Sequence, residues 1–130
     1  MKYTIELTEK QMRMLETVTE EYFRLRMAQT FDFCDDLASM KCDLSPSNPN
    51  HDKIFDDFIK RRDHLSELMR AFYRIAFEPD GYLHEKTEEM LIAEDIWEAV
   101  RFALGRSRWD STLHVGSEPF PTVVKHEEVQ

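Results

Sequence analysis

Glycine is scarce in this chain, and its scarcity constrains the fold more than any other feature of the sequence. Only three of the 130 residues are glycine. The tight turns of β-hairpins commonly need residues with positive φ, and glycine adopts such values most readily. An all-β fold would therefore lack turn residues, whereas the helix formers Glu, Leu, Met, Arg and Ala dominate the chain. The sequence predicts a mainly α-helical protein.

The longest predicted helical segment runs from Thr8 toward Met40 and contains neither proline nor glycine. Thr8 and Gln11 have the spacing of a capping box, in which each side chain binds the backbone N–H group of the other residue. Apolar residues at positions 15, 18, 22 and 25 fall on one helical face. An unbroken helix would be about 50 Å long, which exceeds the width of a domain of this size. We therefore expect a break near Thr30–Phe33, or an apolar face that packs against a partner chain.

Two further helices are predicted in the rest of the chain. Residues 43–52 form a loop that contains two prolines together with serine, asparagine and aspartate. An amphipathic helix is predicted over about Asp52–Phe77, and a third helix over about Thr87–Leu104. Gly105 fits the left-handed position that ends many helices. Residues 1–130 are thus expected to form one domain, a helical bundle of three main helices.

The two ends of the chain are predicted to form a minor β element. Residues Tyr3–Leu7 alternate between apolar and polar side chains, which is the period of a half-buried strand. The expected partner of this strand is the apolar pair Val123–Val124 in the extended C-terminal tail, residues 106–130.

The chain is acidic, with 26 acidic and 17 basic residues and a formal net charge of −9. A field of that sign repels nucleic acid and anionic membranes at long range, so we expect direct contact with neither. The charge either keeps the protein soluble or forms an acidic surface that docks on a basic partner. The N-terminal residues lack the apolar core of a signal peptide. We therefore expect a cytoplasmic protein whose two cysteines, Cys34 and Cys42, are reduced.

The motifs of common enzyme classes are missing, and we expect a protein that is not an enzyme. Glycine-rich phosphate loops need glycines that this chain lacks. The five histidines are scattered, and no Glu-x-x-His pair occurs, so neither a metal nor a cofactor is predicted. One cluster of acids resembles the magnesium ligands of helical nucleotide pyrophosphatases, although acids near a helix N-terminus are also explained by the helix dipole. These residues are Glu85, Glu88, Glu89, Glu94, Asp95 and Glu98.

Arginine residues beside apolar positions are the most informative polar feature. The guanidinium group suits planar, bidentate contacts with phosphate or carboxylate, and nearby aromatic rings can stack on a base. We therefore predict a site for an anionic, nucleotide-type small molecule. The alternative is that these arginines pair between helices with acids such as Asp32, Asp35, Asp36, Asp56, Asp57 and Glu94. The predicted ligand-binding residues are Arg24, Arg26, Arg62, Arg70, Arg74, Arg101, Tyr22, Tyr73 and Trp97.

Several segments carry a resemblance that covers nearly the whole chain. They are Glu21–Gln29, Phe31–Phe33 with Asp35–Asp36, Phe58–Arg62, Ala93–Trp97 with Val100–Arg101, and Glu118–Pro121. In this order they are similar to a family of small helical proteins encoded by bacteriophages and prophages of gut Firmicutes. Members of that family often have glycine where Ala28 stands and leucine where Phe120 stands.

The resemblance implies a phage accessory protein in the host bacterial cytoplasm, and it transfers no catalytic residue. Small acidic phage proteins often counter host defence, either by sequestering a nucleotide immune signal or by blocking an effector protein. We predict sequestration of an anionic nucleotide-derived signal. One alternative is an inhibitor of a host defence effector, of the anti-CRISPR type, that acts through its acidic surface. A second is a magnesium-dependent nucleotide pyrophosphatase. The surplus apolar surface of the first helix favours a homo-oligomer.

Overall fold

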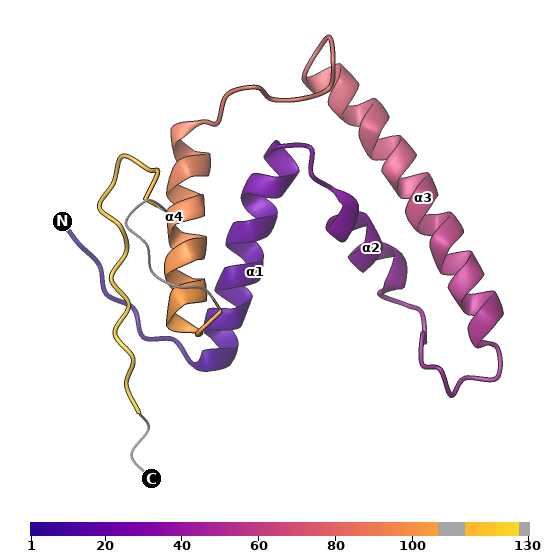
Figure 1. Cartoon of the computed structure of the whole chain (residues 1–130), viewed down its shortest axis with the longest axis horizontal. Coiled ribbons are helices and arrows are strands. Elements are labelled where there is room, and N and C mark those ends of the chain that lie inside the picture. Colours follow the sequence, from indigo (N-terminus) through magenta and orange to yellow (C-terminus); the bar gives the residue numbers. More distant parts are fainter. Residues whose placement is uncertain (107–113, 128–130) are drawn as a thin grey trace. The chain divides into compact units, whose positions relative to one another are not determined.

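The computed structural model describes residues 1–106 and 114–127, and Figure 1 shows the helices in this part of the chain. The prediction of a mainly helical protein is confirmed. The long first segment is divided in two, so the described residues form four helices and not three main ones. They are α1 (Glu9–Arg26), α2 (Phe31–Ser39), α3 (His51–Ala76) and α4 (Glu88–Ala103).

The break between α1 and α2 is centred on Ala28, slightly before the expected segment Thr30–Phe33. Ala28 has a φ of 59°, in the left-handed region. The N–H groups of Met27 and Gln29 both bind the carbonyl of Arg24, at 3.1 and 2.9 Å. These bonds satisfy a carbonyl that the end of α1 would otherwise leave without a partner. The connection therefore ends α1 with this carbonyl hydrogen-bonded and leads into α2.

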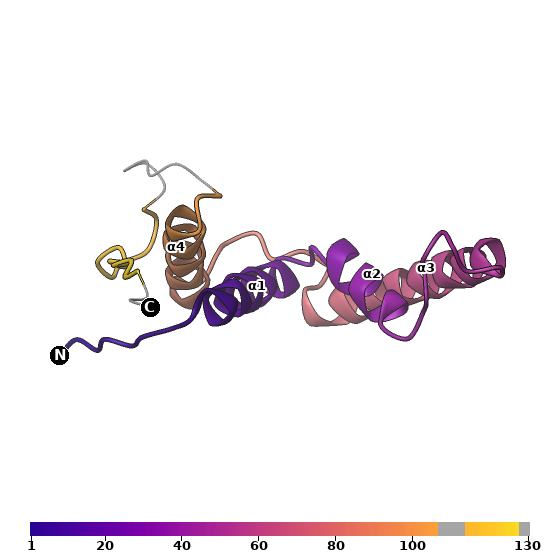
Figure 2. The same cartoon turned by 90° about the horizontal axis from the view of Figure 1, so that it is seen from below.

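The described residues fall into two compact units, Met1–Phe23 with Glu85–Gln130, and Arg24–His84. In the first unit α4 and most of α1 lie side by side (Figures 1 and 2). The rings of Phe23 and Trp97 meet edge to face with their centroids 5.3 Å apart. Met90 and Val100 of α4 are buried in the same unit. The assignment of the whole chain to one domain stays a prediction.

The C-terminal segment of the first unit is held on α4 by a buried carboxylate. Asp95 is 2% exposed and accepts hydrogen bonds from the N–H groups of Val115 and Gly116, both at 2.9 Å. A Cβ atom at Gly116 would lie 2.7 Å from Oδ2 of Asp95 and 3.3 Å from the backbone N of Ile92. The close approach of this segment to α4 therefore depends on glycine at position 116.

In the second unit α2 lies along α3 (Figure 2). Cys34 and Ala38 of α2 are buried, as is Phe58 of α3. Arg61 of α3 donates hydrogen bonds to the carbonyl of Ala38 at 2.9 Å and to Sγ of Cys42 at 3.1 Å. This guanidinium group therefore fastens the end of α2 to α3.

The predicted β element is wrong for the described residues, which contain no strand. In the segment Tyr3–Leu7, Tyr3 and Ile5 are 88% and 77% exposed, and the pair Val123–Val124 is exposed as well. Alternation favours a strand only where a second strand binds its backbone groups, and the described part of the chain offers none. Of the predicted tail, 106–130, residues 107–113 and 128–130 lie outside the described residues.

Candidate functional site

A cavity of about 90 Å³ lies within the second unit, between the α1–α2 connection, α3 and the loop that follows α3. One buried water needs roughly 10–15 Å³, so the cavity has room for a phosphate-sized group. It is too small to enclose a whole nucleotide, since pockets of that kind span about 300–1,000 Å³. The connection contributes Ala28 and Thr30, α3 contributes Arg70, Tyr73 and Arg74, and the loop contributes Asp80, Gly81 and Tyr82.

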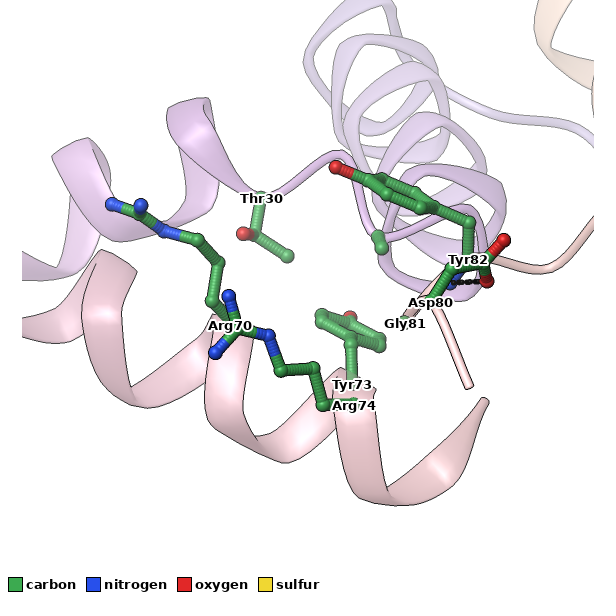
Figure 3. A pocket seen from close by; sticks show the side chains of 8 residues that line it. Thr30, Arg70, Tyr73, Arg74, Asp80, Gly81 and Tyr82 are labelled. Carbon is green, nitrogen blue, oxygen red and sulfur yellow. Dashed lines mark hydrogen bonds between the residues drawn. The ribbon is translucent and has the colours of Figure 1, made fainter. Parts of the chain in front are cut away.

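Arg70 and Arg74 supply the positive charge of this cavity. Their spacing of four residues places them on one side of α3, and Figure 3 shows both side chains extending along the helix. The Thr30 hydroxyl points toward the side on which the two guanidinium groups lie. Within the described residues, neither guanidinium group makes an ion pair or a hydrogen bond. Like charges at this spacing destabilise a helix by about 0.2–0.5 kcal/mol, and a bound anion would offset that repulsion.

Other arginines in the chain are bound by acids. Arg106 contacts the buried Glu16 at 2.6 Å. Arg62, also on α3, lies 3.2 Å from Asp63 and 3.7 Å from Asp35. The pairing that the sequence left open as an alternative therefore holds for Arg62, and among residues 1–106 and 114–127 it does not hold for the two arginines of the cavity.

Tyr73 lines the cavity as a buried residue that is only 6% exposed. Its hydroxyl donates a hydrogen bond to the carbonyl of Leu25, and its ring stacks on Phe77 with centroids 5.8 Å apart. Burial raises the pKa of the Tyr73 phenol, so the group stays protonated and remains a donor at neutral pH. Because Phe77 covers one face of its ring, Tyr73 acts as a structural support and is poorly placed to stack on a ligand.

Gly81 brings the loop after α3 close to the helix. Its N–H group binds the carbonyl of Phe77 at 2.8 Å, and its φ is 83°. A Cβ atom there would lie 3.3 Å from Cγ of Arg74. Glycine therefore serves two needs at this position, a left-handed backbone and a close approach to the stem of Arg74.

Asp80 orders the same loop and positions Tyr82 at the rim of the cavity. Its carboxylate accepts a hydrogen bond from the N–H group of Tyr82 at 3.1 Å (Figure 3) and lies 2.6 Å from Nε2 of His84. The hydrogen bond from Tyr82, followed by that from His84, holds the pKa of Asp80 below its usual value. Tyr82 is 60% exposed, so its ring is accessible to a ligand.

The structure brings together three of the nine predicted ligand-binding residues, Arg70, Tyr73 and Arg74. Arg24 instead donates a hydrogen bond to Gln29 at 3.0 Å, and Arg101 lies over the ring of Trp97 at 4.6 Å. The remaining six predicted residues are absent from the cavity lining: Arg24, Arg26 and Arg62 belong to the second unit, and Tyr22, Trp97 and Arg101 to the first.

Sequence reasoning missed Thr30 and Tyr82. The sequence Pro79–Gly81 is typical of a segment that stops a helix, and that pattern alone assigns no binding role to the loop. An Asp-Gly turn directly after a helix also returns the chain toward that helix, which places the next aromatic residue near the last turns. That pattern was the available signal for Tyr82.

The six acids between Glu85 and Glu98 do not form a metal centre in the described residues, where no three His, Cys, Asp or Glu side chains are grouped to hold an ion. Glu94 binds Nζ of Lys86 with both carboxylate oxygens at 3.0 Å, and Asp95 holds the C-terminal segment. Glu94 and Asp95 therefore have structural partners.

Comparison of the chain with models of known protein families, with curated proteins and with solved structures finds no significant match. None of the helices in the described ranges combines the length and the apolar character needed to cross a membrane.

Proposed function

We propose that this protein is a phage-encoded counter-defence protein that sequesters a small, phosphate-bearing molecule of nucleotide type, and that Arg70 and Arg74 bind the phosphate. The observation that carries the proposal is that these two guanidinium groups lie at a cavity and have no partner among the described residues. The chain has nine more acidic than basic residues. An arginine with a purely structural role has many carboxylates to pair with in such a chain, as Arg62 does.

The distribution of charge supports the binding of an anion in the second unit. The first unit contains 8 basic and 15 acidic residues, a formal charge of −7. The second unit contains 9 basic and 11 acidic residues, a formal charge of −2. Long-range repulsion of an anion is therefore much weaker at the unit that contains the cavity.

The residues that line the cavity favour binding of a ligand over its catalytic conversion. Arginine remains protonated at physiological pH and cannot act as a general base. Asp80, the one carboxylate among the described residues that line the cavity, is bound by the N–H group of Tyr82 and by His84. Binding without catalysis suits a protein that lowers the concentration of a signal. The pyrophosphatase alternative makes a separate prediction, that phosphate release is lost in Glu94→Gln and Glu98→Gln.

Calorimetric titration against a panel of mononucleotides, cyclic nucleotides and ADP-ribose-type nucleotides tests the proposal. We expect at least one member to bind, and Arg70→Ala with Arg74→Ala to abolish that binding. Arg13→Ala is the matched control, because Arg13 is an exposed arginine of the first unit that pairs with Glu9. A panel that gives no heat of binding removes the proposal.

A second candidate function is inhibition of a host defence effector through the acidic first unit. The charge of −7 on that unit favours it, together with the exposed apolar residues Met14 and Val18 on α1. Charge-driven association weakens as salt increases. Capture of a host nuclease at low salt and its release at high salt would support this function, whereas capture that is insensitive to salt would contradict the role of charge.

The homo-oligomer stays a prediction. Leu68, Phe72 and Ile75 are 56%, 60% and 78% exposed on α3, at spacings of four and three residues. Such a stripe is typical of a helix that packs against another helix. Sedimentation of the full chain would test it, and a monomer at all concentrations would contradict it.

A further inference from the structure

We infer that the cavity recognises a terminal phosphomonoester and discriminates against phosphodiesters, including those of cyclic nucleotides. The inference rests on the proposed function and specifies the chemical class of its ligand. Three properties of the cavity support it: the positive charge of its lining, the number of its hydrogen-bond donors and its small volume.

The charge of the lining matches a dianion. Arg70 and Arg74 are permanently cationic and unpaired within the described residues. A phosphomonoester carries about −1.5 to −2 at neutral pH, because its second pKa is near 6, whereas a diester carries a single negative charge. A monoester therefore balances both guanidinium groups, while a diester leaves one of them unbalanced beside its neighbour.

The donors of the lining match three terminal oxygens. Thr30 occupies the N-cap position of α2, but its side chain makes no capping hydrogen bond, and its φ of −109° and ψ of 7° lie outside the extended region usual for that position. Its hydroxyl instead points toward the side of the guanidinium groups (Figure 3). Two guanidinium groups and this hydroxyl can each serve one oxygen of a monoester. A diester has only two unsubstituted oxygens, so two of the three donors would have to share one oxygen in a less favourable geometry.

The small volume of the cavity favours a ligand whose phosphate is attached to the rest of the molecule through a single oxygen. The cavity of about 90 Å³ has room for a phosphate-sized group but cannot enclose a whole nucleotide. A diester adds carbon to a second oxygen, so the same small space would have to hold two substituents where a monoester brings one. The base of a monoester would remain outside, where the exposed ring of Tyr82 offers a stacking surface that tolerates any base.

Titration with four matched probes tests the inference: adenosine 5′-monophosphate, its methyl ester at the phosphate, 3′,5′-cyclic AMP and adenosine. A hydrogen bond to a charged group that loses its partner corresponds to a change of about tenfold or more in affinity. We expect the monophosphate to bind at least tenfold more tightly than the methyl ester and the cyclic form, and adenosine not to bind. Equal affinity for monoester and diester overturns the inference and leaves the proposed function standing. Failure of every phosphate probe overturns the inference, and the wider nucleotide panel then decides the proposed function.

Thr30→Val separates specificity from stability. The Thr30 hydroxyl makes no hydrogen bond within the described residues, so its loss should leave the unfolding midpoint unchanged. We expect the preference for monoester over methyl ester to fall several-fold in this variant. Thr17→Val is the control, because the exposed Thr17 hydroxyl binds only the carbonyl of Arg13 in its own helix. A preference unchanged by Thr30→Val would overturn the assignment of the third donor.

Discussion

Arg70 and Arg74 lie four residues apart on α3 at the same cavity, and in the described part of the chain no carboxylate pairs with either of them. Arg62, earlier on the same helix, pairs with Asp35 and Asp63. In the described structure, one helix thus carries one arginine that is paired with acids of the protein and two that are not. The second kind can balance the charge of a ligand, and this difference is the basis of the proposed function.

Ala28→Gly should stabilise the protein. Ala28 has a φ of 59°, and a left-handed residue with a Cβ atom costs about 1–2 kcal/mol. Glycine removes that strain but increases the entropy of the unfolded chain by about 0.4–1 kcal/mol. We expect a net gain of up to about 1 kcal/mol in the free energy of unfolding, measured by urea denaturation. A loss of stability would contradict the left-handed assignment.

Gly116→Ala should release the C-terminal segment from α4. The new Cβ atom would lie 2.7 Å from Oδ2 of Asp95, and overpacking of this kind costs about 1–3 kcal/mol. Amide hydrogen exchange should show loss of protection at Val115. Gly105→Ala is the comparison, because nothing lies within 4 Å of its Cβ position and only its φ of 73° is strained. It should lower stability while Val115 stays protected, and equal loss of protection in both variants would refute the contact.

Arg106→Ala should destabilise the first unit more than Arg13→Ala. Removal of Arg106 leaves the Glu16 carboxylate, whose side chain is only 11% exposed, without its ion-pair partner. Because the Arg106 side chain is itself 44% exposed, water can partly replace it, and we expect a loss of about 1–3 kcal/mol. The exposed pair of Arg13 with Glu9 should contribute less than about 1 kcal/mol.

Glu16→Leu tests the same ion pair by removing the carboxylate in place of the guanidinium group. One oxygen of Glu16 is buried without a hydrogen-bond partner among the described residues. Leucine removes this buried carboxylate, and the Arg106 side chain that remains is 44% exposed and can be hydrated, so no charge stays buried without a partner. Chemical denaturation should therefore show Glu16→Leu to be more stable than Arg106→Ala. The reverse order would contradict the cost that we assign to the unpaired carboxylate.

The loop after α3 should lose its order in acid. The pKa of Asp80 lies below its usual value of 3.8, first because the N–H group of Tyr82 donates to it and next because His84 does. A folded-state pKa that is lowered contributes stability above the unfolded-state pKa, and that contribution is lost as the pH falls through the lowered value. The amide signal of Tyr82 in NMR spectra should therefore hold steady down to about pH 4 and change below it. Asp80→Asn should abolish this transition, and a transition that persists would assign it to another group.

Features that depend on near neighbours in the chain were predictable from the sequence. The capping box is observed, with the N–H group of Thr8 bound to Oε1 of Gln11 at 2.9 Å and the N–H group of Gln11 bound to Oγ1 of Thr8 at 3.2 Å. Gly105 is left-handed, as the end of α4 required. The predicted strand at Tyr3–Leu7 failed because a strand needs a partner from elsewhere in the chain, and alternation says nothing about that partner.

The candidate site was predictable only where it lies on a single helix. Arg70 and Arg74 were predicted because they lie beside apolar positions, and their spacing of four residues within α3 is enough to place them on one side of the helix. Thr30 joins them from a segment forty residues earlier, and such a meeting depends on how α2 packs along α3. The sequence also could not show that Arg62, unlike the two cavity arginines, is paired with an acid, because its partner Asp35 belongs to a different helix.

The most direct test of the central claim is an NMR titration that follows the Nε–H signals of the individual arginine side chains while adenosine 5′-monophosphate is added. The account predicts that the signals of Arg70 and Arg74 shift together and saturate with one binding constant, while those of Arg13 and Arg62 stay in place. Signals of Arg70 and Arg74 that do not move, or that move no more than the signal of Arg13, would contradict it.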